Sequence, residues 1–321
     1  MSPQKSTIVR LLSKGIKVLD QAWPALAERA AARLFFRTPR PVRSGPAHEA
    51  PRSRRRRIAG LAAEEWLPPG PLSDPSGTVL LLHGWGGRRA QLRGFAAPLV
   101  AAGLRVVAVD APGHGESAGR TLSLPAYARA IAAVGRELGP LAAVVAHSFG
   151  GPATALALQD GLRAARVVLI GAPAAPDRWF EAFCEQLDLT PSLRQRFLAR
   201  VELQLGRPMA ALGIENLAEA LSVPLLLIHD RGDREVPFGD AERYLRAAPH
   251  AELLATERLG HRRILRDPRV VEEAVRFVLA APRPRCAACN TAAVAPQERL
   301  CLDCEVGAML AHPDERGLDA A

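Results

Sequence analysis

Short apolar runs of four to six residues recur along the chain from residue 78 onward, and polar or glycine-rich residues follow each run. Between these runs lie longer stretches with apolar residues at helical spacing. This alternation is typical of an α/β protein with a doubly wound, mostly parallel sheet, whose ligand site lies at the carboxyl ends of the strands. The expected strands are 78–82, 104–109, 142–146, 167–170, 225–228 and 251–255.

The alternation stops between residues 174 and 222. Apolar residues there keep a helical spacing, and no strand pattern occurs for almost fifty residues. The segment follows an expected strand, so it emerges at the edge of the sheet where ligands bind. We therefore expect residues 174–222 to form a helical cap.

The N-terminal part of the chain predicts a helix and a linker. Apolar residues recur at roughly helical spacing over residues 8–36, with basic residues between them, until a Thr-Pro-Arg-Pro string begins at Thr38. Residues 38–57 are rich in Pro and Arg and are interpreted as a linker. A basic amphipathic helix can make weak contact with an anionic membrane surface. The alternative is a helix that packs on the domain behind it.

The formal net charge of +9 resides in this N-terminal segment. Residues 1–57 hold fourteen Lys or Arg and three Asp or Glu, a net charge of +11, so residues 58–321 carry −2. A body without excess positive charge lacks the electrostatic basis of nucleic-acid binding, and we expect no nucleic-acid partner. With 48% hydrophobic and 23% charged residues, the composition is that of a folded globular protein.

Targeting patterns are not evident in the sequence. Basic residues at Lys5, Arg10, Lys14 and Lys17 interrupt the first apolar runs, so no secretory signal is predicted. No run of about 18 uncharged apolar residues occurs, so no membrane span is predicted. Five cysteines in a chain of 321 residues are typical of reduced thiols. We expect the protein in the cytoplasm.

A serine lies between an expected strand and an expected helix, in the string AHSFGG at residues 146–151. This is the setting of a nucleophile elbow, a strained turn that exposes a serine and needs small neighbours. Ala146 stands where the usual Gly-x-Ser-x-Gly pattern has its first glycine. A serine hydroxyl is a poor nucleophile at neutral pH, so Ser148 needs a base that a carboxylate orients.

The partners of the serine are expected later in the chain, first the acid and then a histidine. Asp230 and Asp233 both follow the strand expected at 225–228. Asp233 is favoured because the string DREVP places it on the following loop. His261 lies on the loop after the last expected strand, in the string LGHRR, and is the candidate base.

Two glycine-containing turns follow the first two expected strands. The string LHGWGG at residues 82–87 can direct the Trp85 amide at a developing oxyanion, with the Phe149 amide as second donor. Each such donor is typically worth about 3 kcal/mol in the transition state. The string DAPGHGES at residues 110–117 is interpreted as a structural turn that shapes the wall of the site.

Residues from about 60 to 281 resemble the α/β-hydrolase superfamily. The His-Gly-x-Gly turn, the Asp-x-Pro-Gly-His-Gly-x-Ser string, the elbow, the Asp-x-x-Val-Pro loop and the Gly-His loop occur in family order and spacing. The resemblance implies Ser148 as the nucleophile, His261 as the base and Asp233 as the acid that orients it. It also implies the Trp85 and Phe149 amides as the oxyanion hole and a helical cap at 174–222.

The elbow also sets this chain apart from other members of the superfamily. Haloalkane dehalogenases and epoxide hydrolases resemble it but place an aspartate where this chain has Ser148. The departures from the family pattern are Ala146 and the weak strand signal of residues 58–67. The latter predicts a sheet with fewer than the usual eight strands.

Four of the five cysteines form two Cys-x-x-Cys pairs. Cys286 and Cys289 are separated by eleven residues from Cys301 and Cys304. Two such pairs can place four thiolates tetrahedrally around Zn²⁺, at about 2.3 Å, in a closed structural site. The tail therefore resembles a small zinc ribbon, and the alternatives are a pair of redox motifs or incidental thiols. Cys184 has no such partner and is expected in the core.

The sequence thus predicts a basic N-terminal helix and linker at 1–57, an α/β-hydrolase domain at 58–281 and a zinc-ribbon-like tail at 282–321. We expect a serine hydrolase that cleaves a carboxylic ester or related acyl bond of a small molecule through an acyl-enzyme. No phosphate-binding loop or dinucleotide fingerprint occurs, so no cofactor is expected for catalysis. The alternatives are a carbon-carbon bond hydrolase with the same triad, and a non-catalytic adaptor that uses the arm and the zinc ribbon.

Overall fold

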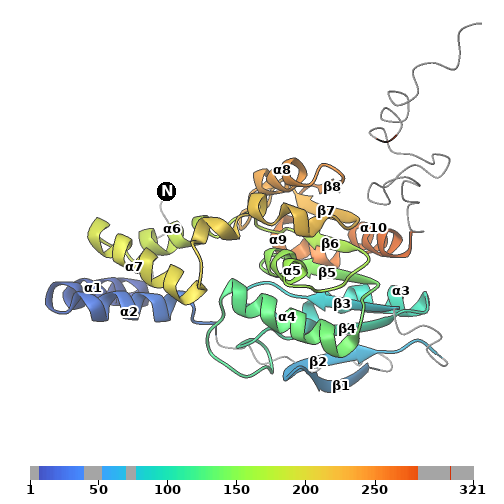
Figure 1. Ribbon diagram of the computed structural model, residues 1–321, viewed down its shortest axis with the longest axis horizontal. Coiled ribbons are helices and arrows are strands. Elements are labelled where there is room, and N and C mark those ends of the chain that lie inside the picture. Colours follow the sequence, from blue (N-terminus) through green and yellow to red (C-terminus); the bar gives the residue numbers. More distant parts are fainter. Residues whose placement is uncertain (1–6, 40–52, 70–76, 281–303, 305–321) are drawn as a thin grey trace, which may run out of the picture. The chain divides into compact units, whose positions relative to one another are not determined.

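The computed structural model describes residues 7–39, 53–69, 77–280 and 304. The chain divides into two compact units, residues 1–278 and 279–321, and the first carries the fold. Its centre is an eight-stranded sheet with the order β1-β2-β4-β3-β5-β6-β7-β8 (Figure 1). The strands are β1 Ser53–Ile58, β2 Leu61–Trp66, β3 Thr78–Leu82, β4 Arg105–Val109, β5 Ala143–His147, β6 Val167–Ile170, β7 Leu225–Asp230 and β8 Glu252–Thr256.

The six strands from β3 to β8 run parallel, and β2 pairs antiparallel with both β1 and β4. All five residues of β3 are buried, as expected for a central strand that is covered on both faces. The next two strands in the chain, β4 and β5, lie on opposite sides of β3, so the direction of strand addition reverses there. The carboxyl ends at such a switch point form the usual ligand crevice of an open α/β sheet.

Helices cover both faces of the sheet and create two apolar cores. Helices α4, α5 and α8 lie on one face of the sheet, and α3 and α10 lie on the other (Figure 1). Leu80 and Leu82 of β3 belong to the core on the first face, and Val79 and Leu81 belong to the core on the second, to which the 3₁₀ helix η1 also contributes. The helices are η1 Arg89–Phe95, α3 Ala96–Ala101, α4 Leu124–Leu138, α5 Gly150–Gln159, α8 Phe238–Ala247, α9 Gly260–Arg263, η5 Ile264–Arg266 and α10 Pro268–Leu279.

The six strands expected from the sequence are present, with ends that shift by at most two residues. The prediction of fewer than eight strands is wrong, because β1 and β2 form an antiparallel hairpin. The linker predicted over 38–57 is also wrong at its end, since Arg54 to Arg57 lie in β1. The side chains of these arginines are exposed at the edge of the sheet, so β1 lacks the apolar alternation that marks a half-buried strand.

The prediction of a single helix over 8–36 is wrong, because the N-terminal segment forms two helices, α1 Thr7–Ala22 and α2 Pro24–Phe35. The break falls at Trp23 because Pro24 has no N–H to continue α1 and is well suited to the first turn of α2. Helix α2 packs against α7, so the segment lies on the domain as the alternative interpretation predicted. The described residues hold no helix long and apolar enough to cross a membrane.

The segment between β6 and β7 is helical, as expected, and its described residues contain no strand. Its helices are α6 Asp177–Gln186, α7 Pro191–Leu205, η2 Met209–Leu212, η3 Ile214–Asn216 and η4 Ala218–Leu221. Helices α6 and α7 lie beside α1 and α2 in a layer next to the sheet (Figure 1). Cys184 of α6 is buried, as predicted.

Candidate active site

Ser148 lies on the turn between β5 and α5 in a backbone conformation that residues other than glycine rarely adopt, with φ of +52°. The turn is tightly packed. A Cβ on Gly150 would lie 3.0 Å from the carbonyl oxygen of His83, and one on Gly151 would lie 2.5 Å from the Cβ of Ala172. The two glycines of the AHSFGG string are therefore required by contact. The strained turn places the serine at a cavity.

The two expected partners of the serine are hydrogen-bonded to each other. His261 Nδ1 donates to Asp233 Oδ2 at 2.7 Å, and both side chains are buried. Asp233 Oδ1 accepts from the N–H groups of Glu235 at 2.8 Å and Val236 at 2.9 Å. Burial alone raises the pKa of Asp233, but the hydrogen bonds from His261 and the two amides outweigh it and hold the pKa below its usual value. An ionised Asp233 fixes the tautomer of His261 with the proton on Nδ1.

Asp230, the other carboxylate that the sequence left open, has a different set of partners. Its Oδ2 accepts from Thr256 Oγ1 and from the Leu259 N–H, both at 2.9 Å, and its Oδ1 accepts from the Gly232 N–H at 2.9 Å. These bonds tie the end of β7 to β8 and to the loop before His261. In the described structure, His261 is not among the hydrogen-bond partners of Asp230, which therefore shapes the loop.

His147, directly before the serine, contacts the candidate base and was not predicted from the sequence. Its Nε2 donates to the backbone oxygen of His261 at 2.9 Å, and the centroids of the two imidazole rings are 4.6 Å apart. Burial lowers the pKa of His147 to about 3, so the ring is neutral. Because His147 adjoins Ser148 in the chain, this contact holds the His261 loop beside the serine. The elbow pattern allows any residue at this position. The presence of a histidine there is therefore the only sequence signal that could have indicated its contact with His261.

Two glycines provide the space that these side chains occupy. A Cβ on Gly84 would lie 2.6 Å from the Cβ of Ser148 and 3.1 Å from its Oγ. A Cβ on Gly171 would lie 3.2 Å from His261 Nδ1 and 3.5 Å from Asp233 Oδ2. The serine therefore lies against the turn after β3, and the His-Asp pair lies against the turn after β6. Both turns are at the carboxyl edge of the sheet.

Both predicted oxyanion donors belong to residues near the serine: Phe149 follows it in the chain, and Trp85 follows Gly84, which lies against Ser148. In the described part of the chain, neither the Trp85 N–H nor the Phe149 N–H donates a hydrogen bond to another residue. Phe149 precedes the first residue of α5, where the helix dipole favours negative charge. The side chains of Trp85 and Phe149 meet edge to face, with ring centroids 5.7 Å apart. Both amides are available to an oxygen atom of a ligand.

Two buried histidines hold the turn after β3 in place. His83 Nε2 accepts from the Ala111 N–H at 2.9 Å, and His114 Nε2 accepts from the Gly86 N–H at 3.0 Å. Each Nδ1 donates to a backbone carbonyl. Burial lowers the pKa of both rings, that of His83 to about 4, so each keeps one donor and one acceptor at neutral pH. The string at 110–117 is therefore structural, as interpreted from the sequence.

Ser148 borders a largely apolar cavity of about 380 Å³. This volume is in the range of small-molecule sites. Most of the other walls come from three parts of the chain: residues 34–37 around the end of α2, residues 122–124 at the start of α4, and the helical segment between β6 and β7. The polar side chains of the lining are Arg37, Ser123, Ser148 and Gln186.

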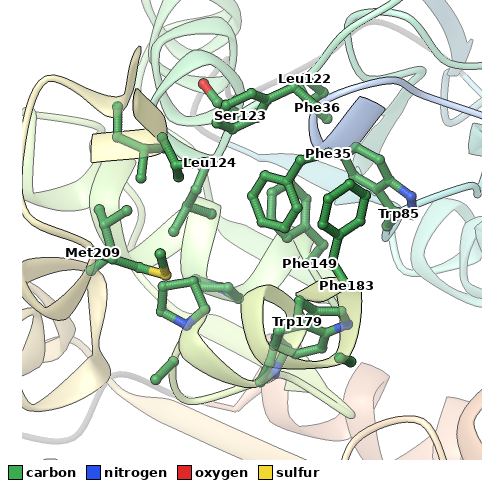
Figure 2. A pocket seen from close by; sticks show the side chains of 18 of the residues that line it. Phe35, Phe36, Trp85, Leu122, Ser123, Leu124, Phe149, Trp179, Phe183 and Met209 are labelled. Carbon is green, nitrogen blue, oxygen red and sulfur yellow. The ribbon is translucent and has the colours of Figure 1, made fainter. Parts of the chain in front are cut away.

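Aromatic side chains gather on one side of this cavity, with Leu124 and Met209 across from them (Figure 2). Phe35 of α2 meets Phe183 of α6 edge to face, with ring centroids 5.3 Å apart. Trp85 extends the same aromatic wall (Figure 2). The contribution of α2 was not predicted, because a contact between residues 35 and 183 depends on tertiary packing.

The predicted zinc site lies almost entirely outside the described residues. Cys286, Cys289 and Cys301 are not described, and Cys304 is. Within the described residues, no group of three or more His, Cys, Asp or Glu side chains is arranged to hold a metal ion.

The fold defines an α/β protein with a cavity at the carboxyl edge of its sheet. Residues 79–274, more than half of the chain, match the model of the alpha/beta hydrolase family. The chain belongs to the alpha/beta hydrolase family, and it is a hydrolase.

Several known proteins are similar to this chain. A pimeloyl-[acyl-carrier protein] methyl ester esterase of Aromatoleum aromaticum is 29% identical over 252 residues, which are 62% of this chain and 98% of the relative. An esterase of Pyrococcus furiosus has 19% identity and a TM-score of 0.56, and covers 76% of this chain and 96% of its own. A 2-hydroxy-6-oxo-6-phenylhexa-2,4-dienoate hydrolase of a Rhodococcus species has 22% identity and a TM-score of 0.53, and the match covers 71% of this chain and 99% of that one. The two solved structures support the fold alone.

Proposed function

We propose that the protein is a serine esterase that cleaves a carboxylic ester or related acyl bond through an acyl-enzyme. The observation that carries the proposal is the hydrogen bond from His261 to the buried Asp233, on a loop that contacts His147, the residue before Ser148 on its strained turn. The methyl ester esterase among the relatives supports an ester as the bond that is cleaved.

The proposed reaction has two halves that use the same base. Ser148 Oγ attacks the ester carbonyl carbon while His261 Nε2 takes the hydroxyl proton. The carbon-oxygen bond to the alcohol then breaks, and Nε2 gives that proton to the departing oxygen. In the second half, His261 takes a proton from water as the water oxygen attacks the acyl carbon. The acid leaves, and Nε2 returns the proton to Ser148 Oγ.

The negative charge of each tetrahedral intermediate needs stabilisation. In the proposal, the Trp85 and Phe149 amides donate to the oxyanion, each typically worth about 3 kcal/mol. Asp233 stabilises the imidazolium that His261 forms in both halves. Support comes from the two amides without a described acceptor and from the depressed pKa of Asp233.

The cavity indicates the class of acyl group. Its lining is mostly aliphatic and aromatic, and its few polar side chains include Arg37 and Gln186. Burial of an apolar chain gains about 0.8 kcal/mol per methylene, so the site favours a medium or long apolar acyl chain over acetate. We propose that the segment at 174–222 acts as a cap over this chain, together with α2.

A panel of p-nitrophenyl esters tests this proposal. We expect kcat/KM to rise from acetate through butyrate to octanoate, by about threefold to fourfold per methylene until the cavity is filled. Ser148→Ala should abolish turnover in a folded protein, whereas Ser192→Ala, at an exposed position on α7, should not. A folded wild-type protein that cleaves none of these esters contradicts the proposal and favours the adaptor alternative.

A further inference from the structure

The hairpin of α1 and α2, residues 7–35, exposes an unusual amount of apolar surface. Ten large apolar side chains are exposed in the described part of the chain, and six of them lie on this hairpin. Ile8 is 70% exposed and Trp23 is 62% exposed. We call this surface the outer face, and its apolar residues are Ile8, Leu11, Leu12, Val18, Trp23 and Leu26. Apolar residues gathered in this way mark an interaction surface.

The acidic residues of the hairpin point the other way. Asp20 pairs with Arg196 of α7, and Glu28 pairs with Arg200 of the same helix at 2.8 Å. The side chains of Asp20 and Glu28 are only 13% and 15% exposed. Asp20 and Glu28 are the only acidic residues in 7–35, so packing on α7 removes negative charge from the outer face.

Basic residues remain on the exposed side. Lys14 of α1 and Arg29 and Arg33 of α2 are exposed, whereas the buried residues of these helices include Ile16 and Ala27. The outer face is therefore apolar and cationic, without a carboxylate. This combination is typical of helices that lie in the interface of an anionic lipid bilayer.

The position of the outer face relates it to the cavity. Helix α2 carries Leu26 on the outer face. The helix ends at Phe35, and both Phe35 and the next residue, Phe36, line the cavity. Leu26 and Phe35 are nine residues apart, which is about 14 Å along a helix. A surface that binds the outer face thus lies close to one wall of the cavity.

We propose that the outer face of the α1–α2 hairpin docks the protein on an anionic lipid bilayer. A second copy of this chain fits the face poorly, because a symmetric contact sets the same cationic residues against each other. A bilayer accepts the apolar side chains below its headgroups and pairs the basic ones with phosphate. The docking does not depend on the proposed esterase activity. The delivery of a membrane-borne acyl substrate to the cavity does rest on that proposed activity.

Sedimentation of the full-length protein with vesicles tests the docking. We expect binding to equimolar phosphatidylcholine and phosphatidylglycerol, and far weaker binding to phosphatidylcholine alone. The variant Lys14→Gln/Arg29→Gln/Arg33→Gln should bind anionic vesicles roughly a hundredfold more weakly, at about fivefold per basic residue. The matched control Arg129→Gln/Arg136→Gln/Arg163→Gln removes three exposed charges elsewhere and should bind as the wild type does.

A second variant, Leu11→Ser/Val18→Ser, tests the apolar part of the face and should also lose vesicle binding. Hydrolysis of soluble p-nitrophenyl butyrate should be unchanged in both hairpin variants, which separates lost docking from misfolding. Wild-type binding by either hairpin variant overturns the docking proposal. A second result would also overturn the docking proposal. In it, the wild-type protein does not bind vesicles and is a dimer in size-exclusion chromatography, and Leu11→Ser/Val18→Ser dissociates this dimer. A protein that binds anionic vesicles but cleaves no ester contradicts the proposed function alone.

Discussion

His261 Nδ1 donates to Asp233 Oδ2 at 2.7 Å, and Asp233 Oδ1 at the same time accepts two backbone N–H groups. The carboxylate is therefore fixed by its own loop before it orients the imidazole. Hydrogen bonds outweigh burial in setting its charge, because its pKa lies below the usual value. A carboxylate in this state fixes the tautomer of the neutral His261 ring with the proton on Nδ1, so that Nε2 is the acceptor nitrogen.

The variant Asp233→Asn tests this relationship. It keeps the size of the side chain but removes the charge, and it can present an N–H to Nδ1, which favours the wrong tautomer. We expect kcat for ester hydrolysis to fall by about 10⁴-fold with little change in KM. Asp240→Asn is the control, since the Asp240 side chain accepts from the Ala174 N–H and an amide oxygen can do the same. Equal kcat in the two variants would argue against the role of Asp233.

His147 is a positioning residue in this account, because it acts through the backbone of His261. His147→Ala removes the donor and should lower kcat by up to about 100-fold through a small displacement of the base. His147→Gln can still donate and should recover part of the loss. A merely structural role for His147 predicts instead that both variants lose melting temperature while kcat of the folded fraction stays constant.

Gly84→Ala tests the placement of the turn after β3. The added Cβ would lie 2.6 Å from the Cβ of Ser148, so the turn and the Trp85 amide must shift. Loss of one oxyanion donor costs about 10² to 10³ in kcat. Gly239→Ala is the matched control, because its Cβ would meet no atom within 4 Å. Unchanged kcat in Gly84→Ala would show that the Trp85 amide is not a donor in the reaction.

The buried histidines predict how stability depends on pH. His83 has a pKa of about 4 and His147 a pKa of about 3 in the folded protein, both lowered first by burial. The unfolded chain binds protons at these rings below about pH 6.5, whereas the folded chain does not. The free energy of unfolding therefore falls as the pH decreases from this value towards 4, by about 1.4 kcal/mol per pH unit for each ring.

Urea unfolding of His83→Asn at several pH values checks this dependence. The variant lacks one of the buried rings with a lowered pKa, so its free energy of unfolding should change less steeply between pH 6 and pH 5, by about 1.4 kcal/mol per pH unit. Parallel curves for the wild type and the variant would contradict the assignment of His83 as a neutral buried ring.

The zinc ribbon of the tail stays a prediction that metal analysis can test. We expect one zinc ion per purified chain, and its loss in Cys286→Ser and in Cys301→Ser. Cys184→Ala is the control, since Cys184 is buried in α6 and should not affect the zinc content. Wild-type protein without zinc, or zinc that survives both serine substitutions, contradicts the prediction.

The sequence predicted six strands because each is a short apolar run followed by a turn, and all of them except the edge strand β8 are largely buried. It failed at β1 and β2 because their pattern depends on distant partners. Glu64 and Glu65 of β2 are buried in spite of their charge, and they pair with Arg93 at 2.7 Å and with Arg105 at 2.5 Å. No local pattern reveals such pairs.

The candidate site shows the same division. Local motifs and their order predicted Ser148, Asp233 and His261 as site residues, and the structure shows the hydrogen bond between the last two. The role of His147 depends on a hydrogen bond to a residue 114 positions away, and the aromatic wall depends on contact between Phe35 and α6. These contacts arise from tertiary packing, and a single sequence carries no periodicity that reports them.

The central claim is that Ser148 is the nucleophile. Intact-protein and peptide mass spectrometry after treatment with a fluorophosphonate tests it most directly. We expect one adduct per chain on the peptide that contains Ser148, no adduct in Ser148→Ala, and much slower labelling in His261→Ala. Folded wild-type protein that stays unlabelled, or an adduct that persists in Ser148→Ala, would contradict it.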